Sequence, residues 1–566
     1  MKKIAWIFLC ISCWAVQTAW AKTGGADYTI LSAGIESFPA TVYGNPYVGN
    51  YRSILEIAPE ISGLKGVRLP VDGQGNLKAA RLQLKFNQSV KLLLGVTTSP
   101  DRAAVASSLA KLNFHKGKLA SKPVLLRALS MTELPAMDVY EVRYAAGEQE
   151  LTIPENPGCH IVILGAIPSG KKIAYRNVKL EDQENYEAFY IDGFANNTPL
   201  FTVVGGQDEP VINVGSAGTE EILGGFEAGS VVRVNNVYHM FPTERTGAPD
   251  MPISHDRVKT RIGHWTSPDA IHWTRQEPII ESSGVYAIVH EDNPMNDRRS
   301  AIWSFNAVFN EENNRWYGYY LCYTTDKDVQ PNHSFGRIWR CESQVPGREG
   351  IAGPYKDMGI IVEPGWDSQL WEGRQGVASF YPFKVKDNWY GFISGAYPFL
   401  SREDYPLHGG KKKMAWYVGL AQSETMEGPW TRMGEDVNPL TCIHPTFCEN
   451  PIVSQLPNGL YIAMFDGGPS YLKLPNKIAY TLSKDGINWT RAHYIAIDSK
   501  INKWWMTMRT PLCLIPEGDD VYTIVFTAWV HDDASDNPNA KTRFNPVGMV
   551  KVKLDNAVLD EIAKGL

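Results

Sequence analysis

The chain has 566 residues, more than one hydrophobic core usually serves, so we expect two domains. Hydrophobic residues make up 44% of the sequence and charged residues 20%, a composition that excludes a largely disordered chain. The formal net charge of -6 argues against nucleic acid as the main partner, because phosphate binding needs a concentrated basic surface.

The first residues have the pattern of a signal peptide. Lysines at positions 2–3 precede an apolar stretch over residues 4–16 and the sequence Ala-Trp-Ala at 19–21. This order of charged, apolar and cleavage-site segments predicts a signal peptide over residues 1–21, with the mature chain starting near Lys22. We therefore expect an exported protein, periplasmic or secreted. No later segment is long and apolar enough to span a bilayer.

The eight cysteines leave two questions open. Cys10 or Cys13 could instead carry the lipid of a lipoprotein, although neither has the usual leucine three positions before it. Export permits disulfides among the other six, but the sequence cannot assign their pairing. None of the six has the paired spacing of a structural zinc site, so we expect no metal and no cofactor. The six are Cys159, Cys322, Cys341, Cys442, Cys448 and Cys513.

Residues 22–194 are expected to form a β-sandwich. Apolar and polar residues alternate in short runs, as strands with one buried face require. One helix is predicted around residues 102–112. The clearest alternating runs are 82–86, 90–94, 139–142 and 159–164.

From about residue 195 to residue 566, the sequence repeats one shape five times. Each copy has an apolar alternating run, a tight turn of Asn, Asp or Gly, and a second run with a tyrosine near its start, which together predict a β-hairpin. The tyrosines are 61 to 79 residues apart, an interval that suits a four-stranded blade with sizeable loops. The hairpins span residues 231–238, 307–317, 383–390, 452–461 and 512–522, and their tyrosines are Tyr238, Tyr317, Tyr390, Tyr461 and Tyr522.

A second motif recurs between the hairpins. Residues 267–273 and 483–489 share the pattern Ser-x-Asp-x-Ile-x-Trp, each followed by Thr-Arg. In a propeller blade such a turn reverses the outer strands, and the indole fills the gap between neighbouring blades. Because the inner and outer motifs alternate along the chain, we prefer a propeller over five unrelated hairpins in a sandwich. The predicted fold is all-β, with an N-terminal β-sandwich followed by a five-bladed β-propeller over residues 195–566.

The candidate site lies where the inner strands of the blades begin, because a propeller usually binds its ligand over the central channel. Three blades bring glutamates to this position, Glu227, Glu372 and Glu449. Paired carboxylates suit glycoside hydrolysis, in which one protonates the leaving oxygen and the other serves water or the sugar. Candidate substrate-binding residues at the same strand ends are Trp303, Trp371, Arg374, Gln375, His444 and Arg509.

At these positions, over residues 220–550, the chain resembles the five-bladed propeller glycosidases, the superfamily that includes the family 43 arabinanases and xylosidases. Glu449-Asn450-Pro451, followed by an Asn-Gly turn, is similar to the family's Glu-Gly-Pro motif, in which the Glu is the general acid. Residues 302–306, Ile-Trp-Ser-Phe-Asn, are similar to its Trp-Ala-Pro-Glu segment, although the Pro and the Glu are missing. Glu227 falls where the family carries its base, normally an Asp within Asp-Pro. Glu372 is nearest to the position of the Asp that tunes the acid.

The resemblance implies an inverting glycoside hydrolase, with Glu449 as acid, Glu227 as base or nucleophile and Glu372 as modulator. The tryptophans of the candidate set would stack on sugar rings, and its arginines and Gln375 would bind hydroxyl or carboxylate groups. Long loops would block one side of the channel and favour exo-acting hydrolysis of oligosaccharides from plant or algal polysaccharides. These loops span residues 248–261, 325–337 and 399–413.

Two other functions stay open. The altered segment 302–306 and the missing Asp-Pro are also consistent with a glycan-binding propeller that has no catalytic activity. A propeller lyase would need a Tyr or His base beside a uronate. The sequence does not indicate an oligomeric state.

Overall fold

The computed structural model describes residues 25–566 apart from several internal segments. The predicted signal peptide, residues 1–21, lies within residues 1–24, which are outside the described part. Within the described part, no helix has the length and the hydropathy needed to cross a membrane. The internal segments outside the description are 42–43, 49–51, 59, 98–101, 132–133, 174–198, 247–258, 286–293, 298, 326–332, 366, 373–374, 398–414, 435, 441, 445–446, 467–476, 497–506 and 530–543.

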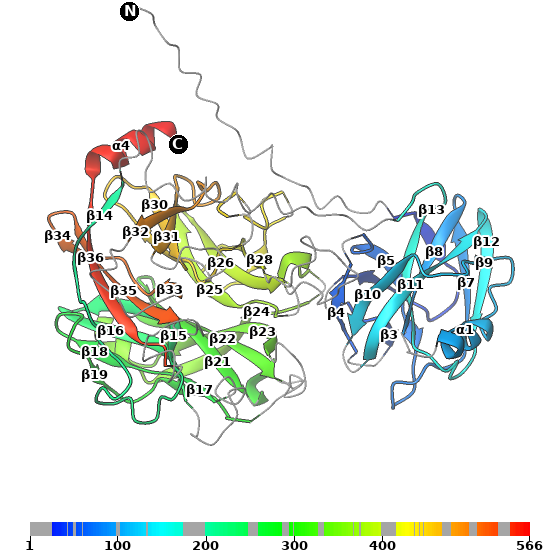
Figure 1. Ribbon diagram of the computed structural model, residues 1–566, viewed down its shortest axis with the longest axis horizontal. Coiled ribbons are helices and arrows are strands. Elements are labelled where there is room, and N and C mark those ends of the chain that lie inside the picture. The colour runs from blue at the N-terminus through cyan, green and yellow to red at the C-terminus, as the bar shows by residue number, and fades with distance from the viewer. Residues whose placement is uncertain are drawn as a thin grey trace, which may run out of the picture. The chain divides into compact units, whose positions relative to one another are not determined.

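The contacts within the chain divide it into two compact units, both built almost wholly of β-strands (Figure 1). This content confirms the predicted all-β class. The predicted domain boundary at residue 194 falls within 174–198, outside the described residues, and stays a prediction. The first unit is Met1–Leu180 with Gly365–Gly373 and Pro398–Lys413, and the second is Glu181–Pro364, Arg374–Tyr397 and Met414–Leu566.

The first unit is a β-sandwich with a sheet of eight strands and a sheet of three. Residues of β7 (Ala80–Phe86) alternate between buried and exposed, whereas β8 (Val90–Thr97) is buried throughout. Phe86 of the smaller sheet stacks on Tyr144 of the larger one, with ring centroids 5.7 Å apart, so the two sheets share a core. The predicted helix is confirmed as α1 (Arg102–Ala110). The larger sheet contains β2 (Ser37–Ala40), β5 (Leu64–Val67), β13 (Ile161–Pro168), β8, β11 (Leu134–Tyr144), β10 (Leu125–Met131), β4 (Ile54–Ile57) and β9 (Lys118–Leu119); the smaller one contains β1 (Tyr28–Ile30), β7 and β12 (Gly147–Ile153); and β3 (Tyr47–Val48) pairs with β6 (Leu69–Pro70).

The second unit contains five antiparallel sheets, one for each predicted blade of the propeller. Sheets 1 to 4 follow one another along the chain. Sheet 5 combines strands from both ends of the unit, because β14 (Phe201–Gly206) pairs with β36 (Val547–Leu554), as Figure 1 shows. Sheet 1 holds β15 (Gly225–Val234), β16 (Val237–Arg245), β17 (Thr260–Ile262), β18 (Trp265–Ser267), β19 (Thr274–Arg275) and β20 (Ile280–Glu281); sheet 2 holds β21 (Ala301–Asn310), β22 (Arg315–Thr325), β23 (His333–Ser343) and β24 (Tyr355–Val362); sheet 3 holds β25 (Ser379–Val385), β26 (Asn388–Tyr397), β27 (Ala415–Ser423) and β28 (Thr431–Arg432); sheet 4 holds β29 (Ile452–Gln455), β30 (Tyr461–Phe465), β31 (Lys477–Ser483) and β32 (His493–Ala496); and sheet 5 holds β14, β33 (Thr507–Pro511), β34 (Ile515–Gly518), β35 (Val521–Trp529) and β36. Short 3-10 turns are η5 (Pro294–Asn296), η6 (Arg348–Ala352) and η7 (Leu370–Glu372).

Four of the five predicted hairpins are confirmed, as β15–β16, β21–β22, β25–β26 and β29–β30. The first of them turns at Asn235 and Asn236, whose φ angles are 49° and 63°. Asparagine tolerates this left-handed conformation, and two such residues in succession make the tight turn that matches the twist of the strands.

The fifth hairpin differs from its prediction at the start. The predicted run over residues 512–515 is not a continuous strand, because Leu512–Leu514 lie between β33 and β34. The Val525 N–H contacts Cys513 Sγ at 3.4 Å rather than a backbone carbonyl, which interrupts the regular pairing. Leu512 still donates its N–H to Val525 O at 2.8 Å, so the chain stays against β35.

Hydrogen bonds join neighbouring sheets of the second unit. They link sheet 1 to sheet 2, sheet 2 to sheet 3, sheet 3 to the segment that enters sheet 4, and sheet 1 to the segment after β33 of sheet 5. The five sheets therefore contact one another in chain order, as blades do. The bonds run from Ser230 Oγ to Phe305 O (3.0 Å), from Asn306 Nδ2 to Phe380 O (2.8 Å), from Cys448 N to Trp416 O (2.9 Å) and from Val231 N to Leu512 O (2.8 Å).

The repeated tyrosines of sheets 1 and 2 make matching contacts with another sheet. Tyr238 OH donates to Glu517 on β34 of sheet 5. Tyr317 OH donates to Glu427, between β27 and β28 of sheet 3. A tyrosine suits this position because its ring is buried within the blade while its hydroxyl reaches a carboxylate of the neighbouring blade.

The two outer motifs fold into the same turn. In each, the Asp Oδ1 accepts the N–H groups of the residues two and three positions later, at 2.7–2.9 Å. The indole N–H of the Trp donates to the carbonyl of the residue after the Asp, at 3.0 Å. Trp489 also packs on Phe392 of sheet 3, with ring centroids 5.1 Å apart, which confirms for this residue the predicted contact between blades.

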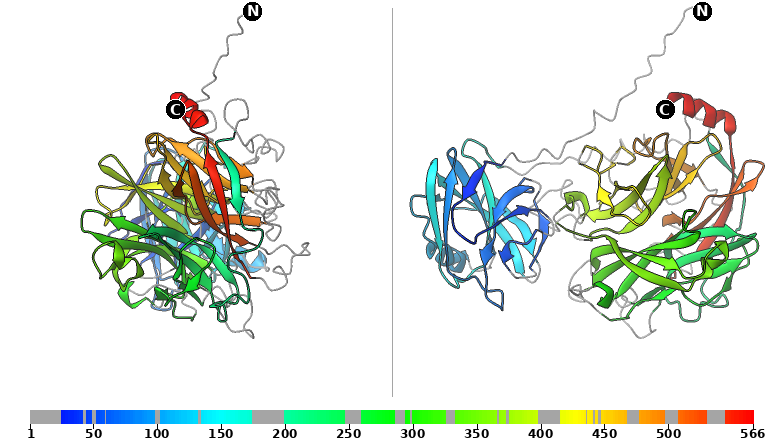
Figure 2. Two further views of the ribbon diagram at one scale, coloured as in Figure 1. Left: turned by 90° about the vertical axis from the view of Figure 1, so that its left-hand side faces the viewer. Right: turned by 180° about the vertical axis from the view of Figure 1, so that it is seen from behind.

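The chain ends in helix α4 (Asn556–Gly565), which directly follows β36 in every view (Figures 1 and 2). Asp555 caps the helix, since its Oδ1 accepts the N–H groups of Ala557 and Val558 at 2.9 and 3.1 Å. Leu559 and Ile562 on the apolar side of the helix belong to the core that sheets 4 and 5 share.

Candidate active site

Glu227 lies on β15 beside a β-bulge. The pairing of β15 with β16 shifts register between Glu227 and Gly229, and Ala228 between them has a φ of 49°. Glycine is needed at position 229, because a Cβ there would lie 2.1 Å from Phe241 O. A bulge redirects the side chains next to it. The half-buried Glu227 therefore departs from the regular pleat of its strand.

Sheet 2 has a bulge of the same kind. The register of β21 shifts just after Trp303, and Ser304 has a φ of 54°. The N–H of Ser304 donates to Thr243 Oγ1 of sheet 1 at 2.9 Å. In the same way, the N–H of Ala228 donates to Thr527 Oγ1 of sheet 5 at 3.3 Å. In both inner strands, a threonine of another blade thus supports the bulge.

Glu449 and Asp466 lie at the two ends of the hairpin β29–β30. The residue before the first strand and the residue after the second are neighbours in such a hairpin, and the N–H of Asp466 donates to Glu449 O at 3.3 Å. Asn450 has a φ of 50°, and its Nδ2 donates to Asp466 Oδ2 at 3.5 Å. This left-handed conformation accounts for the Asn where the Glu-Gly-Pro motif has Gly, since both residues tolerate it.

Burial and like charges favour the protonated form of both carboxyl groups. Asp466 is 0% exposed, and neither its Oδ1 nor the buried Glu449 Oε2 has a hydrogen-bond partner among the described residues. Burial, followed by the negative charges of Asp466 and Glu227, raises the pKa of Glu449 well above its usual value. Burial and the charge of Glu227 also raise the pKa of Asp466, against hydrogen bonds from Thr510 and Asn450 that lower it. A carboxyl group that stays protonated near neutrality can act as a general acid.

Tyr323 and Gln375 extend this group of residues. Gln375 Nε2 donates to Tyr323 OH at 2.8 Å. The pKa of Tyr323 is raised well above its usual value by burial and by the charges of Glu449 and Glu227, so the phenol remains neutral. Thr510 on β33 forms a hydrogen bond with Asp466. Each of the five sheets, or the segment that leads into it, therefore contributes a residue to this group. We refer to Glu227, Glu449 and Asp466 as the carboxyl cluster.

Three of the predicted site residues, Glu227, Gln375 and Glu449, are thus brought together. Trp303 lies beside the bulge of β21, but its side chain is buried. Little of its ring is open to a ligand, and its stacking on a sugar stays a prediction.

Glu372 and Trp371 belong to the first unit through the segment Gly365–Gly373, and not to the sheets that carry the carboxyl cluster. Both lie in η7 and are buried. Glu372 Oε1 accepts the N–H of Gln369 at 2.8 Å, and the indole N–H of Trp371 donates to Gln369 Oε1 at 2.6 Å. These contacts hold a local turn. The roles of Glu372 as modulator and of Trp371 as a sugar platform stay predictions.

His444 makes a hydrogen bond within its own loop. It is buried, and its Nδ1 accepts the N–H of Phe447 at 2.9 Å. Burial lowers the pKa of His444 to about 3, so the ring is neutral. Arg374 lies outside the described residues, and Arg509 lies on β33 with its side chain outside the description. The substrate-binding roles of these three residues stay predictions.

The sequence did not point to Asp466, Tyr323 or Thr510. The predicted site lies at the starts of the inner strands, whereas Asp466 follows β30 and Tyr323 lies near the end of β22. In an antiparallel hairpin these ends lie beside the start of the inner strand. The sequence signal for Asp466 is its place directly after the mostly apolar run 461–465.

The described residues give no indication of a metal site or a disulfide. No group of three or more His, Cys, Asp or Glu side chains among them is arranged to hold a metal ion. All six cysteines that follow the predicted signal peptide are free thiols.

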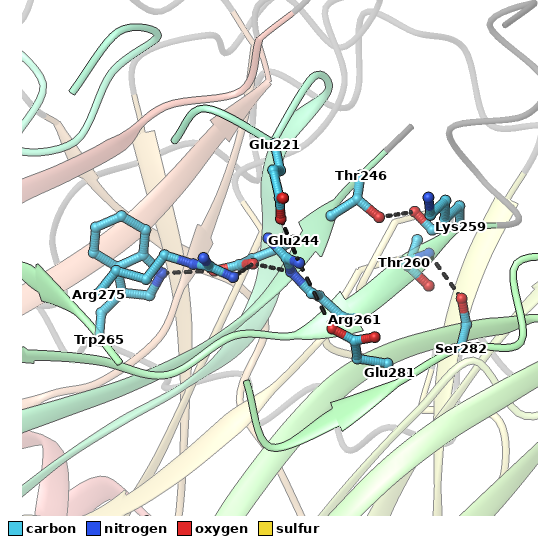
Figure 3. A network of polar contacts seen from close by, with 10 residues as sticks. All are labelled: Glu221, Glu244, Thr246, Lys259, Thr260, Arg261, Trp265, Arg275, Glu281 and Ser282. Atoms are coloured by element: carbon cyan, nitrogen blue, oxygen red, sulfur yellow. Dashed lines mark hydrogen bonds and ion pairs between the residues drawn. The ribbon is translucent and has the colours of Figure 1, made fainter. Parts of the chain in front are cut away.

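A polar cavity of about 470 Å³ lies at a different place on sheet 1 (Figure 3). Its lining includes Lys259, Arg261, Glu221 and Glu281. Arg261 forms ion pairs with Glu221 at 3.2 Å, with Glu281 at 3.7 Å and with the buried Glu244 at 2.5 Å. Because Arg261 pairs with Glu221 and Glu281 of the lining, we interpret the cavity as part of a structural network.

Comparisons with known proteins yield structural likenesses alone. No family model matches the chain, and no curated protein matches it in sequence. Zg3597, a family 117 glycoside hydrolase from the marine bacterium Zobellia galactanivorans, is 14% identical over 63% of this chain and 90% of its own, with a TM-score of 0.39. CoXyl43, a family 43 β-xylosidase/α-arabinofuranosidase from a compost microbial metagenome, is 14% identical over 62% and 95%, with a TM-score of 0.38. An exo-1,5-α-L-arabinanase from a bovine ruminal metagenomic library is 13% identical over 59% and 95%, with a TM-score of 0.35. Because the identities and TM-scores are low, these three glycoside hydrolase structures are only distantly similar to this chain and assign no activity to it.

Proposed function

We propose that this protein is a glycoside hydrolase in which Glu449 is the general acid and Glu227 the base. One observation carries the proposal. Glu449, on sheet 4, has a buried Oε2 with no partner among the described residues and a raised pKa, and the charge that helps to raise it comes from Glu227 on sheet 1. Two carboxyl groups in one site, of which one keeps its proton, are what acid and base catalysis of glycoside hydrolysis needs.

The proposed reaction consumes one water molecule for each glycosidic bond that is cleaved. Glu449 gives its proton to the glycosidic oxygen while the bond from this oxygen to the anomeric carbon breaks. Water attacks the anomeric carbon and gives its proton to Glu227. Tyr323, kept neutral by the two carboxyl groups, supplies a hydroxyl to this site, and Gln375 orients it. Attack by water makes the reaction inverting, as the resemblance implies.

The proposed substrates are oligosaccharides of plant or algal polysaccharides, cleaved from the chain end by an exported enzyme. The resemblance and the long loops over residues 248–261, 325–337 and 399–413 support this part of the proposal. Most of these loop residues and the predicted signal peptide lie outside the described part of the chain. The exo mode and the export therefore rest on the sequence.

A lyase that uses Tyr323 as its base is disfavoured. A lyase base must lose its proton before it can take one from the substrate. The charges of Glu449 and Glu227 oppose ionisation of the Tyr323 hydroxyl, since they raise its pKa. The remaining alternative is a glycan-binding protein without activity, which the altered segment 302–306 favours.

Turnover by the full chain and by Glu449→Gln separates these functions. The purified protein is incubated with a panel of plant and algal oligosaccharides, and reducing ends are measured. We expect hydrolysis by the wild type and a loss of at least 100-fold in Glu449→Gln, because the acid is removed. Glu424→Gln, an exposed Glu-to-Gln control in the loop after β27, should retain full activity. Binding without turnover by the wild type would contradict the enzyme and support the binding protein.

A further inference from the structure

We propose that the polar cavity of sheet 1 binds one sugar unit of the substrate, at a distance from the bond that is cleaved. The inference rests on the proposed function for the nature of the ligand. It adds a binding site that no sequence motif marked. Three features carry it: the place of the cavity beside Glu227, the guanidinium group of Arg261, and the mixture of hydrogen-bond donors and acceptors in the lining.

The cavity lies at the end of sheet 1 where β15 begins. Leu223, which lines the cavity, precedes Glu227 by four residues, so their Cα atoms are at most about 14 Å apart. Thr246 of the lining directly follows β16, whose last residue pairs with Gly225 at the start of β15. The cavity is therefore at the same edge of the sheet as the base of the proposed reaction, at a distance that a short oligosaccharide can span.

One wall of the cavity is joined to the inner strand of sheet 2. Thr260 Oγ1 donates to Ile302 O and accepts the N–H of Ile302, both at 2.8 Å. Ile302 directly precedes Trp303, beside the bulge of β21. The starts of two inner strands thus fix the position of the cavity relative to Glu227.

The ion pairs of Arg261 hold the walls in place but leave part of its guanidinium group unused (Figure 3). Nε donates to Glu244, and Nη1 pairs with Glu221 and Glu281. Nη2 is buried and has no hydrogen-bond partner among the described residues, and the whole residue is only 8% exposed. A buried donor that stays unpaired is unfavourable, and an oxygen of a ligand in the cavity would supply the missing acceptor.

The lining suits a neutral ligand with many hydroxyl groups, because Lys259 and Arg261 can donate while Glu221 and Glu281 can accept. Three glutamates against two cations disfavour an anion, and the described residues include no group arranged to hold a metal ion. Hydroxyl groups both donate and accept hydrogen bonds. The volume of about 470 Å³ is in the usual range of small-molecule sites. A sugar unit is therefore the ligand that the lining favours.

Lys259→Met tests the inference by calorimetric titration. Lys259 is exposed, so the variant should fold, and both the variant and its parent carry Glu449→Gln so that bound oligosaccharides stay intact. The probes are xylo-, arabino-, galacto- and agaro-oligosaccharides with two to six sugar units. The longer members of the series that binds should bind roughly tenfold or more weakly to the variant, because a hydrogen bond from a charged donor is lost. Disaccharides, which reach only the carboxyl cluster, should bind as they do to the parent.

Lys356→Met is the matched control. Lys356 is an exposed lysine on β24 and is not part of the lining, so its loss should leave the affinity for every probe unchanged. Equal weakening by Lys259→Met at all lengths, or no weakening at any length, would overturn the inference.

Hydrolysis by the wild type separates failure of the inference from failure of the proposed function. If the wild type hydrolyses a probe but Lys259→Met binds every length as its parent does, the inference fails alone. If the wild type hydrolyses none of the probes while Lys259→Met weakens the binding of the longer ones, the proposed function fails and the cavity remains a site for a sugar unit.

Discussion

Arg261 donates from its Nε to Glu244 Oε2 at 2.5 Å in the interior of sheet 1 (Figure 3). Glu244 is fully buried and also accepts the indole N–H of Trp265 at 2.8 Å and the guanidinium of Arg275 at 3.3–3.4 Å. A Cβ at Gly263 would lie 2.2 Å from Glu244 Oε1, so this glycine leaves room for the carboxylate. One buried carboxylate thus connects β16, β17, β18 and β19.

Glu244→Gln should lower the free energy of unfolding by about 3–5 kcal/mol. The substitution leaves the guanidinium of Arg261, whose side chain is 10% exposed, without its closest counter-charge. Urea-induced unfolding of the full chain measures the loss.

Glu281→Gln is the matched control for this prediction. Glu281 lies 3.7 Å from the same arginine, but its side chain is 63% exposed. Exposed ion pairs contribute about 0–1 kcal/mol, so this variant should remain close to the wild type. Equal losses in the two variants would contradict the structural role of the buried carboxylate.

Gly486→Ala should destabilise the outer turn of sheet 4. Gly486 has a φ of 73°, and an added Cβ would lie 2.6 Å from Val385 Cγ2 and 3.0 Å from Phe383 Cε2 of sheet 3. Backbone strain and the overlap between blades together should cost about 2–4 kcal/mol. Gly459→Ala separates the two effects, because Gly459 has a φ of 87° and nothing within 4 Å of an added Cβ. The control should lose only the strain, about 1–2 kcal/mol in thermal or urea unfolding.

The repeated turns explain why the fold could be predicted. The bonds of Asp485 to the N–H groups of Ile487 and Asn488 join residues two and three positions apart, so a short motif contains the whole turn. The same holds for the Asn235-Asn236 hairpin turn. Five copies of such local signals are enough to indicate five blades, although the run over residues 512–515 shows that a side chain such as Cys513 can interrupt a strand without a local signal.

The site was predictable only in part because its contacts are not local. Glu449 and Glu227 were found from strand starts, but their relation to Asp466 and Tyr323 depends on how separate sheets pack. Glu372 was chosen from its place before an inner strand. A position along the chain does not tell which unit a connecting segment packs with, and the segment Gly365–Gly373 packs with the first.

The carboxyl cluster should make the protein less stable as the pH rises. Burial raises the folded-state pKa of Glu449 and Asp466 above the ordinary carboxyl value of about 4. Below pH of about 4 both groups are protonated in the folded and the unfolded chain, and their contribution to the free energy of unfolding is fully present. This contribution is lost as the pH rises through their folded-state pKa values. Asp466→Asn removes one of them. Its free energy of unfolding, relative to the wild type, should therefore be more favourable at pH 9 than at pH 5, by roughly 1 kcal/mol or more.

Glu424→Gln controls for the general effect of removing an acidic side chain. The residue is exposed, so the difference between this variant and the wild type should be the same at both pH values. A difference between Asp466→Asn and the wild type that does not change with pH would contradict the raised pKa of Asp466.

Thr527→Val should weaken the bulge beside Glu227. Thr527 Oγ1 accepts the N–H of Ala228 at 3.3 Å, and valine keeps the shape of the side chain but leaves this buried donor without its acceptor. The expected loss is about 1–3 kcal/mol of unfolding free energy. Because the bulge sets the direction of Glu227, we also expect a lower kcat in glycoside hydrolysis. Thr243→Val removes the matching bond to Ser304 in sheet 2 and should cost similar stability. An unchanged kcat in Thr527→Val would show that the bulge of β15 does not direct the base.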